Sequence, residues 1–200
     1  MCGRFYSDME IVDSILQMAG GRAEELDIPK TGDIYPSQKA LILSNRRPDF
    51  YAETMRWGFP RFDKKGLLIN ARAETAPEKR SFQEGVLHHR CVIPARRFYE
   101  WDKEKTKVAF QNENGSPLFM AGFYKRFEEG DRFIIITTEA NESMFPIHDR
   151  MPLILSESQL GDWIYNQKAA LEMLRQPSPM LQRFQEEEQL LLTINADKMG

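Results

Sequence analysis

The feature that most constrains the fold of this chain is a succession of short apolar runs, each bounded by polar or turn-forming residues. The runs occupy residues 40–43, 67–69, 91–93, 118–123 and 133–138. Such lengths are typical of β-strands, whereas a buried helix needs about ten or more residues. Strands that follow one another across turns pair most simply as antiparallel neighbours. We therefore predict an α+β fold with a predominantly antiparallel sheet core.

Three further segments have the pattern of short helices around that sheet. Residues 7–10 form a capping box, and an apolar stripe at helical spacing follows them up to a pair of glycines. Residues 81–84 open a second short helix. Residues 156–175 form a third helical region, which begins with a Ser-x-x-Gln cap and ends before Pro177. No internal repeat and no second domain are visible in the sequence, so we expect one domain over residues 1–200.

The distribution of charge along the chain matters more than its sum. The formal net charge is −3, but residues 39–97 carry 13 Lys and Arg against 6 Asp and Glu. This stretch is therefore net +7 and the rest of the chain net −10. The asymmetry favours a basic face that contacts phosphates. The alternative is that these charges spread evenly over solvated surface.

Several classes of protein do not fit the sequence. No run approaches the roughly 18 apolar residues that cross a bilayer, and the N-terminus lacks the apolar core of a secretion signal. We therefore expect a cytoplasmic protein without a membrane partner. The two cysteines, Cys2 and Cys91, are 89 positions apart, which argues against a disulfide framework. No group of Cys and His residues has zinc-site spacing, so we expect neither a metal nor another cofactor.

Cys2 is the first candidate for chemistry. Removal of Met1 would leave a cysteine whose amine and thiol are on adjacent carbons. An α-amino group has a pKa of about 8 and a free thiol a pKa of about 8.5, so both are partly reactive near neutral pH. An aldehyde can form an imine with that amine, and the thiol can then close a five-membered thiazolidine. Cys91 lies within a predicted strand, where its amine is locked in a peptide bond, and is expected to fill space in the core.

Two polar segments near predicted strands hold further candidates. Residues 70–75, NARAET, come directly after a predicted strand, where a loop can present Asn70 and Arg72 to a ligand. A turn or a helix cap is the alternative. Glu100 lies in the sequence FYEW, in which alternation places it on the same face as Phe98. Desolvation between aromatic rings would favour the protonated carboxyl near neutrality, and a structural ion pair with an arginine is the other interpretation.

His148 and Trp57 complete the set of candidates. His148 lies between two prolines in the sequence FPIHDRMP, which suits it to proton transfer, although a lone histidine can also be structural. Trp57 lies beside Arg56 and Gly58, as a residue that stacks on nucleic-acid bases would. An aromatic residue at this spacing also fits a core position.

The order and wording of these segments resemble the SOS-response-associated peptidase (SRAP) family. The similar segments are MCGR at residues 1–4, WG at 57–58, NARAET at 70–75, RC with Pro94 at 90–94, FYEW at 98–101, TT with AN at 137–141, IHDRMP at 147–152, and Asn195. The resemblance therefore spans nearly the whole chain. The joint occurrence of these segments is far more specific than any one of them.

The resemblance implies a single compact domain built on a curved, barrel-like β-sheet with short peripheral helices, and a basic groove for single-stranded DNA. Proteins of this family crosslink through their N-terminal cysteine to the ring-opened aldehyde of an abasic site. This would place the chain in the DNA damage (SOS) response, as a monomer found in the cytoplasm and at the nucleoid. The peptidase activity in the family name is most easily assigned to removal of the residue before Cys2.

The same resemblance assigns roles to individual residues. Cys2 would form the covalent bond, and Asn70 would position its amine. Glu100 would act as general acid and base, and His148 would assist opening of the sugar ring. Trp57 would stack on or wedge between bases. The residues that would contact phosphates are Arg4, Arg72, Arg80 and Arg150.

Two other functions stay open at the level of sequence. One is a cysteine hydrolase for peptides, in which His148 activates Cys2 or Cys91 and Glu100 orients the histidine. The other is a module that binds single-stranded nucleic acid without covalent chemistry, through the basic stretch and Trp57. The abasic-site function is favoured because it explains both a cysteine at position 2 and the distant carboxylate and histidine.

Overall fold

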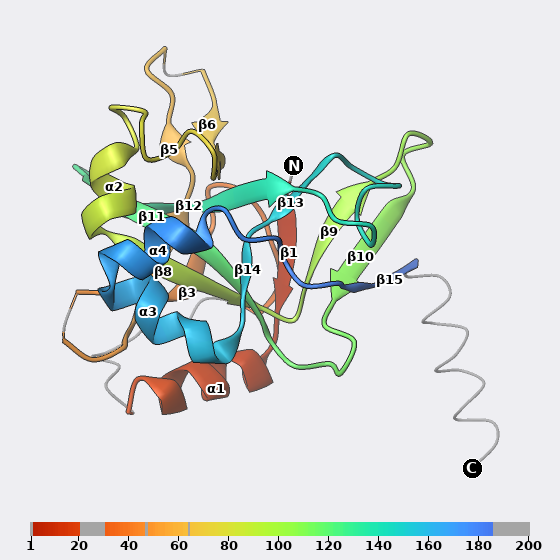
Figure 1. Cartoon of the computed structure of the whole chain (residues 1–200), viewed down its shortest axis with the longest axis horizontal. Coiled ribbons are helices and arrows are strands. Elements are labelled where there is room, and N and C mark those ends of the chain that lie inside the picture. The colour runs from red at the N-terminus through yellow and green to blue at the C-terminus, as the bar shows by residue number, and fades with distance from the viewer. Residues whose placement is uncertain (1, 21–30, 47, 64, 186–200) are drawn as a thin grey trace.

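Five strands close into a barrel (Figure 1). The computed structural model describes residues 2–20, 31–46, 48–63 and 65–185. The barrel strands are β3 (Lys39–Ser44), β4 (Tyr51–Trp57), β8 (Arg90–Ala95), β11 (Leu118–Phe127) and β12 (Gly130–Glu139). They pair in the ring β12-β4-β3-β8-β11-β12, in which the β4–β12 contact is parallel and the other four are antiparallel. The prediction of a mainly antiparallel, barrel-like sheet is confirmed.

Strand β12 extends beyond the barrel and pairs with two more strands. Its second half pairs in parallel with β7 (Asn70–Arg72) and antiparallel with β13 (Arg150–Pro152). The short strand β14 (Ile154–Leu155) pairs with β11. Residues 70–72 therefore form a strand, whereas the sequence predicted a loop. The pairing of β12 with β4 ends at Phe133. Beyond that residue, the same edge of β12 pairs with β7.

A second sheet has five strands in the order β15-β10-β9-β1-β2, all antiparallel. Its strands are β1 (Arg4–Ser7), β2 (Gly32–Ile34), β9 (Arg97–Trp101), β10 (Lys107–Gln111) and β15 (Gln182–Gln185). A separate hairpin of β5 (Phe59–Pro60) and β6 (Leu67–Leu68) projects from the molecule (Figure 1).

All three predicted helical regions are present as short helices. They comprise α1 (Met9–Met18), α2 (Gln83–His88), the 3-10 turn η1 (Glu157–Gln159), α3 (Leu160–Tyr165) and α4 (Gln167–Met173). The cap of the first helix differs from the prediction. Ser7 ends β1, so Asp8 caps α1 by accepting a hydrogen bond from Ile11 N at 3.0 Å, and α2 starts without a side-chain cap. No helix in the described ranges is long and apolar enough to cross a membrane.

Alternate side chains of the barrel strands enter two hydrophobic clusters. In β3, Leu41 joins the cluster that contains the helix residues, whereas Ile42 joins the cluster that contains Phe5 and Phe98 of the five-stranded sheet. Both faces are covered along much of β3, β8, β11 and β12, so these strands contain apolar runs, whereas burial alternates along most of β4. The five-stranded sheet covers the barrel with one face, and Cys2 belongs to this second cluster.

Candidate active site

Cys2 lies just before β1, where its side chain is enclosed. The residue is 1% exposed, and its Sγ donates a weak hydrogen bond to the carbonyl oxygen of Arg4 at 3.7 Å. Strand β1 pairs with β9 so that Arg4 is opposite Tyr99, which brings the start of β1 to Glu100. Burial and the negative charge of Glu100 raise the pKa of the Cys2 thiol. The thiol is therefore neutral at physiological pH in this conformation.

Asn70, at the first position of β7, forms a hydrogen bond with Cys2. Its Nδ2 donates a hydrogen bond to the carbonyl oxygen of Cys2 at 3.0 Å. The parallel pairing of β7 with β12, in which Asn70 lies opposite Ile135, fixes this side chain. The Asn70 Oδ1 is buried and has no hydrogen-bond partner within the described ranges. A buried acceptor of this kind is available to a donor on a ligand or on a rearranged N-terminus.

Glu100 lies on β9 with its carboxyl group turned into the protein. It is 4% exposed and lies opposite Val108 of β10, on the face of β9 that also carries the buried Phe98. The alternation predicted for this segment is therefore present. The negative charge of Glu100 acts on the Cys2 thiol, so the carboxyl belongs to the surroundings of that residue.

His148 lies in the connection between β12 and β13, 29% exposed in its side chain. Its Nδ1 is 2.9 Å from both the backbone nitrogen of Arg150 and the Oδ1 of Asp149. These two contacts are alternatives, because Nδ1 accepts from a backbone N–H only when unprotonated and donates to a carboxylate only when protonated. The neighbouring Ile147 and Met151 pack in the same hydrophobic cluster as Cys2.

Arg150 does not present its guanidinium to solvent as predicted. It is 8% exposed and pairs with Glu74 through two hydrogen bonds, Nη1–Oε1 at 2.7 Å and Nη2–Oε2 at 2.9 Å. Its Nη2 also donates to the carbonyl oxygen of Thr137. In this arrangement the guanidinium is held by protein groups, so contact with a phosphate would require Arg150 to leave Glu74. Its observed role is to tie β13 to the segment that follows β7.

The other predicted arginines divide into two kinds. Arg72 and Arg80 are exposed, as a phosphate contact requires. Arg4 is half-buried: its Nη1 is 3.4 Å from Asp33 Oδ2, and its guanidinium lies over the rings of Tyr35 and Trp101. Arg4 is therefore already surrounded by protein groups, and only its edge reaches the surface.

The basic stretch at residues 39–97 forms a basic face only in part. Arg90 is 3% exposed and donates to backbone carbonyls at the ends of α2 and α3, where cations are favoured. Arg46 and Arg96 are held in ion pairs with acidic side chains. The basic residues of the stretch that are exposed or half-buried near β4 to α2 are Arg56, Arg61, Lys65, Arg72, Lys79 and Arg80.

Trp57 is a core residue, and base stacking by Trp57 does not fit the structure. It is 0% exposed, its Nε1 donates to the carbonyl oxygen of Ile69 at 3.0 Å, and its ring packs against Phe5 and Phe133. The sequence reasoning missed Phe62, which is fully exposed in the turn between β5 and β6. The signal was present, because an aromatic residue in a charged, glycine-containing turn has no core to join.

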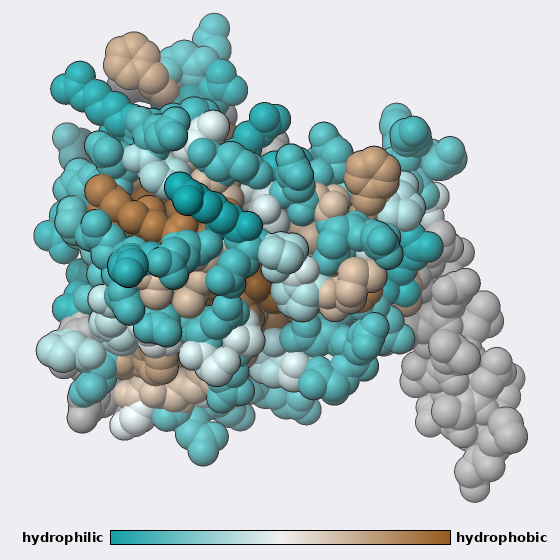
Figure 2. All heavy atoms as spheres, in the orientation of Figure 1, coloured by the Kyte–Doolittle hydropathy of each residue, from teal (hydrophilic) through white to brown (hydrophobic). Residues whose placement is uncertain are grey.

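Figure 2 shows this hairpin as a projection from a face that is mostly hydrophilic. The chain runs from the hairpin through β6 directly into Asn70. The exposed ring of Phe62 therefore belongs to the same segment as the residue that contacts Cys2.

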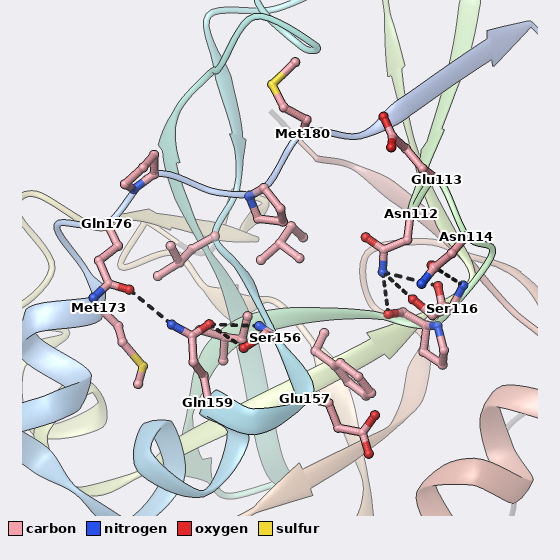
Figure 3. A pocket seen from close by; sticks show the side chains of 17 residues that line it. Asn112, Glu113, Asn114, Ser116, Ser156, Glu157, Gln159, Met173, Gln176 and Met180 are labelled. Carbon is pink, nitrogen blue, oxygen red and sulfur yellow. Dashed lines mark hydrogen bonds between the residues drawn. The ribbon is translucent and has the colours of Figure 1, made fainter.

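A cleft of about 620 Å³ lies elsewhere, between the β10–β11 turn, β14 and the end of α4 (Figure 3). Its lining combines apolar side chains such as Phe119 and Met173 with polar ones such as Asn112 and Gln159. None of the residues predicted for catalysis or DNA binding lines it, so this cleft is not the candidate site. No group of three or more His, Cys, Asp or Glu residues that could hold a metal was found among the described residues.

Comparison with known proteins identifies relatives over most of the chain. A family model described as "SOS response associated peptidase (SRAP)" matches residues 1–195. The chain is 37% identical over 179 residues to the abasic site processing protein YoqW of Bacillus subtilis, a match that covers 82% of this chain and 80% of the relative. It is 33% identical over 178 residues to the abasic site processing protein YedK of Escherichia coli, covering 82% and 79%.

Solved structures of two bacterial proteins have the same fold. A protein of Bacteroides thetaiotaomicron superposes with a TM-score of 0.77 at 20% identity, covering 92% of this chain and 91% of the other. A protein of Bordetella bronchiseptica gives a TM-score of 0.75 at 24% identity, covering 92% and 99%. At these identities the likeness concerns the fold.

Proposed function

Because this chain belongs to the SOS response associated peptidase (SRAP) family, we propose that it processes abasic sites in single-stranded DNA by binding them covalently to Cys2. The observation that carries the proposal is the contact of Asn70 with the Cys2 carbonyl at 3.0 Å, beside the buried Glu100. An N-terminal cysteine, a carboxyl and an amide together meet the needs of thiazolidine chemistry.

The reaction has two bond-forming steps after Met1 has been removed. The free α-amine of Cys2 adds to the aldehyde carbon of the ring-opened sugar, and loss of water gives an imine. The thiol then adds to the imine carbon: a carbon–sulfur bond forms, and the thiol proton is transferred to nitrogen. Hydrolysis of the bond before Cys2 is the peptidase step that we assign to the family name.

The raised pKa of the thiol favours this order of steps. A neutral thiol is a poor first nucleophile, so the amine attacks first and the sulfur follows once the imine is in place. Glu100 would carry a proton from the attacking amine to the departing hydroxyl as the imine forms, and would then carry the thiol proton to the imine nitrogen as the ring closes. Asn70 would hold the Cys2 backbone so that the amine points at the aldehyde.

The remaining roles concern the DNA strand. His148 would protonate the sugar oxygen from its imidazolium form, in which Nδ1 donates to Asp149 Oδ1, and would so assist ring opening. Arg72 and Arg80 would contact phosphates. Phe62 replaces Trp57 as the residue proposed to stack on a base, because its ring is fully exposed. The protein would act as a monomer.

A cysteine hydrolase is less compatible with the site. Such an enzyme needs a thiolate, and thiolates are stabilised by cationic surroundings that lower the thiol pKa. Burial raises the pKa of both thiols, and the charge with the largest effect on each is a carboxylate. A neutral, buried thiol beside a negative charge suits ring closure onto an imine better than attack on a peptide.

The test compares three N-termini on one abasic oligonucleotide. Protein with a free Cys2 amine should form an adduct that survives denaturing gels. Protein with an uncleaved N-terminal extension should still bind DNA through its arginines but form no thiazolidine, and protease removal of the extension should restore the adduct. Intact mass spectrometry establishes the state of each N-terminus. Full crosslinking by a verified extended protein would exclude the proposed chemistry, because a blocked amine cannot form an imine.

A further inference from the structure

Two neighbouring hollows lie along residues 176–180, in the stretch of chain between α4 and β15. The first is the cleft of about 620 Å³ described above, and the second, also of about 620 Å³, lies between this stretch and the β12–β13 connection. Both are lined by Pro177 and Met180, so the two hollows adjoin. We call the pair the Pro-Met groove. Two hollows that share a wall suit an extended ligand such as a peptide better than one compact small molecule.

The open parts of the Pro-Met groove are apolar. Met180 is 51% exposed, and Phe145, which lines the second hollow, is 69% exposed. Pro177 and Pro179 are exposed as well, and the buried Met173 lines the first hollow below them. Exposed apolar side chains that gather in one groove are typical of interaction sites, and methionine adapts its shape to irregular partners.

The charged side chains of the groove are all negative. Glu113 and Glu157 line the first hollow and Glu142 lines the second, and all three residues are exposed. None of the three forms an ion pair within the described part of the chain. Among the described residues, no Lys, Arg or His lines either hollow. The groove therefore disfavours phosphates and favours a cationic ligand.

Hydrogen bonds within the protein hold the walls of the groove in place. Asn141 Nδ2 donates to the carbonyl oxygen of Ser178 at 3.0 Å, and the Ser178 hydroxyl accepts from Ile154 N of β14 at 3.0 Å. Figure 3 shows a further hydrogen bond, from Gln159 Nε2 to Gln176 Oε1 at 3.1 Å. Such preorganisation lowers the entropic cost of binding a ligand.

The groove is separate from the residues proposed for the reaction with DNA. None of Cys2, Asn70, Glu100 and His148 lines either hollow. The exposed arginines at positions 72 and 80 do not line them either. Binding in the groove can therefore be measured without DNA and without the covalent chemistry.

We infer that the Pro-Met groove binds a peptide segment of another protein, one that carries large apolar side chains beside lysine or arginine. The apolar side chains of the peptide pack on the methionine, phenylalanine and proline side chains of the groove, and its cations pair with the three glutamates. DNA does not fit this surface, because its phosphates would meet only carboxylates. The inference goes beyond the proposed function and does not rest on it.

Peptide selection tests the chemical class of the partner. A phage-displayed library of random peptides is panned against the full-length protein, and the enriched peptides are synthesised with a fluorescent label. Their sequences should combine Leu, Met, Phe or Trp with Lys or Arg, and fluorescence anisotropy should show saturable binding that weakens as salt is added. Enrichment of acidic or wholly polar peptides, or no enrichment at all, would contradict the inference.

Two pairs of variants locate the bound peptide. Met180→Ser removes an exposed apolar contact and should weaken binding of the selected peptides by about fivefold or more. Met9→Ser is the matched control, because Met9 is also 51% exposed but lies on α1, outside both hollows. Glu157→Lys should weaken binding by about threefold or more at low salt, whereas Glu128→Lys, in the turn between β11 and β12, should bind like the parent protein.

Two further outcomes would overturn the inference. One is equal affinity of Met180→Ser and Met9→Ser for the selected peptides, with circular dichroism showing that both variants are folded. The other is a dimer of the parent protein, seen by light scattering, that Met180→Ser converts to a monomer, because a second copy of this chain would then occupy the groove. The peptide assay contains no DNA, so a failure of the chemistry proposed for Cys2 would leave its result unchanged.

Discussion

The two cysteines have similar environments and different chemical prospects. Cys2 and Cys91 are both buried in the same hydrophobic cluster, and burial raises the pKa of both thiols. Each thiol also feels a nearby carboxylate, Glu100 for Cys2 and Glu53 for Cys91. By burial, thiol ionisation and neighbouring charge, the two sites are nearly equivalent.

They differ in what the backbone around each cysteine can do. Cys91 lies inside β8, which is paired on both sides, opposite Ser44 of β3 and Gly122 of β11. Glu53 is fixed there by a hydrogen bond from the Ser44 hydroxyl and an ion pair with Arg46 at 2.9 Å. Cys2 precedes the first strand and is one cleavage away from a free amine. A buried thiol beside a carboxylate thus becomes reactive toward aldehydes only at a chain terminus.

The largest expected effect separates the two cysteines directly. Cys2→Ala should form no thiazolidine adduct with abasic single-stranded DNA, because both the thiol and its pairing with the amine are lost. Cys91→Ala should form the adduct at the parent rate and lose only a little stability, on the order of 1 kcal/mol for a small buried atom. Denaturing gels and thermal unfolding measure the two quantities. An equally strong adduct in Cys2→Ala would move the chemistry to another residue.

The carboxylates provide the next comparison. Glu100→Gln keeps the shape of the side chain but removes its acid–base function, so we expect crosslinking to slow by about 100-fold or more while DNA binding stays close to normal. Glu53→Gln should leave the crosslinking rate unchanged and instead weaken the fold, because Arg46 loses an ion-pair partner. Single-turnover crosslinking rates and denaturant midpoints report on the two variants. A parent-like rate in Glu100→Gln would reduce that residue to a structural role.

We expect a smaller difference in crosslinking rate when the asparagine near each cysteine is replaced. Asn70→Ala removes one hydrogen bond to the Cys2 carbonyl, and a bond of about 1 kcal/mol corresponds to a crosslinking rate roughly fivefold lower. Asn45 is the matched control: it accepts a hydrogen bond from the Tyr124 hydroxyl and donates to the His88 carbonyl. Asn45→Ala should crosslink at the parent rate. Equal rates in the two variants would mean that Asn70 does not position the reacting residue.

Much of the barrel could be predicted from sequence because β3, β8, β11 and β12 contain segments that are buried on both faces. Residues 118–123 and 133–138 are apolar runs that became parts of β11 and β12. The first helix was also predictable, but its cap was not. Ser7 and Asp8 are both good capping residues, and the choice of Asp8 depends on β1 extending through Ser7 to pair with Gly32.

The sequence identified candidate residues of the site, but it did not predict which of their side chains are exposed. The contact between Asn70 and Cys2 joins residues 68 positions apart, and only the pairing of β7 with β12 brings it about. Arg150 was expected at the surface, but its partner Glu74 is 76 positions away and no local pattern reveals the pair. Trp57 and Phe62 show the same limit of sequence-based prediction. Spacing predicts the face of a strand on which a side chain lies, but tertiary packing decides whether that face is buried. The expectation for Asn195 falls outside the described residues.

The smallest expected effect concerns the arginines of the two regions. Arg72 is exposed at the end of β7, in the strand that carries Asn70, whereas Arg46 is held by Glu53 and Asp131 near Cys91. If Arg72 contacts one phosphate, Arg72→Ala should reduce the slope of log affinity against log salt by about 0.7 for a single strand. Arg46→Ala should leave that slope unchanged, since its charge is already neutralised within the protein.

Binding isotherms of an undamaged oligonucleotide at four or more salt concentrations measure both slopes. Arg80→Ala extends the comparison, because it is also exposed and should behave like Arg72→Ala. Comparing slopes rather than single affinities is essential, because a loss of folded protein lowers the apparent affinity at every salt concentration and leaves the slope unchanged. A slope reduced in Arg46→Ala and unchanged in Arg72→Ala would assign the DNA path to the Cys91 side of the barrel, and the distinction between the two cysteines would then rest on the free amine alone.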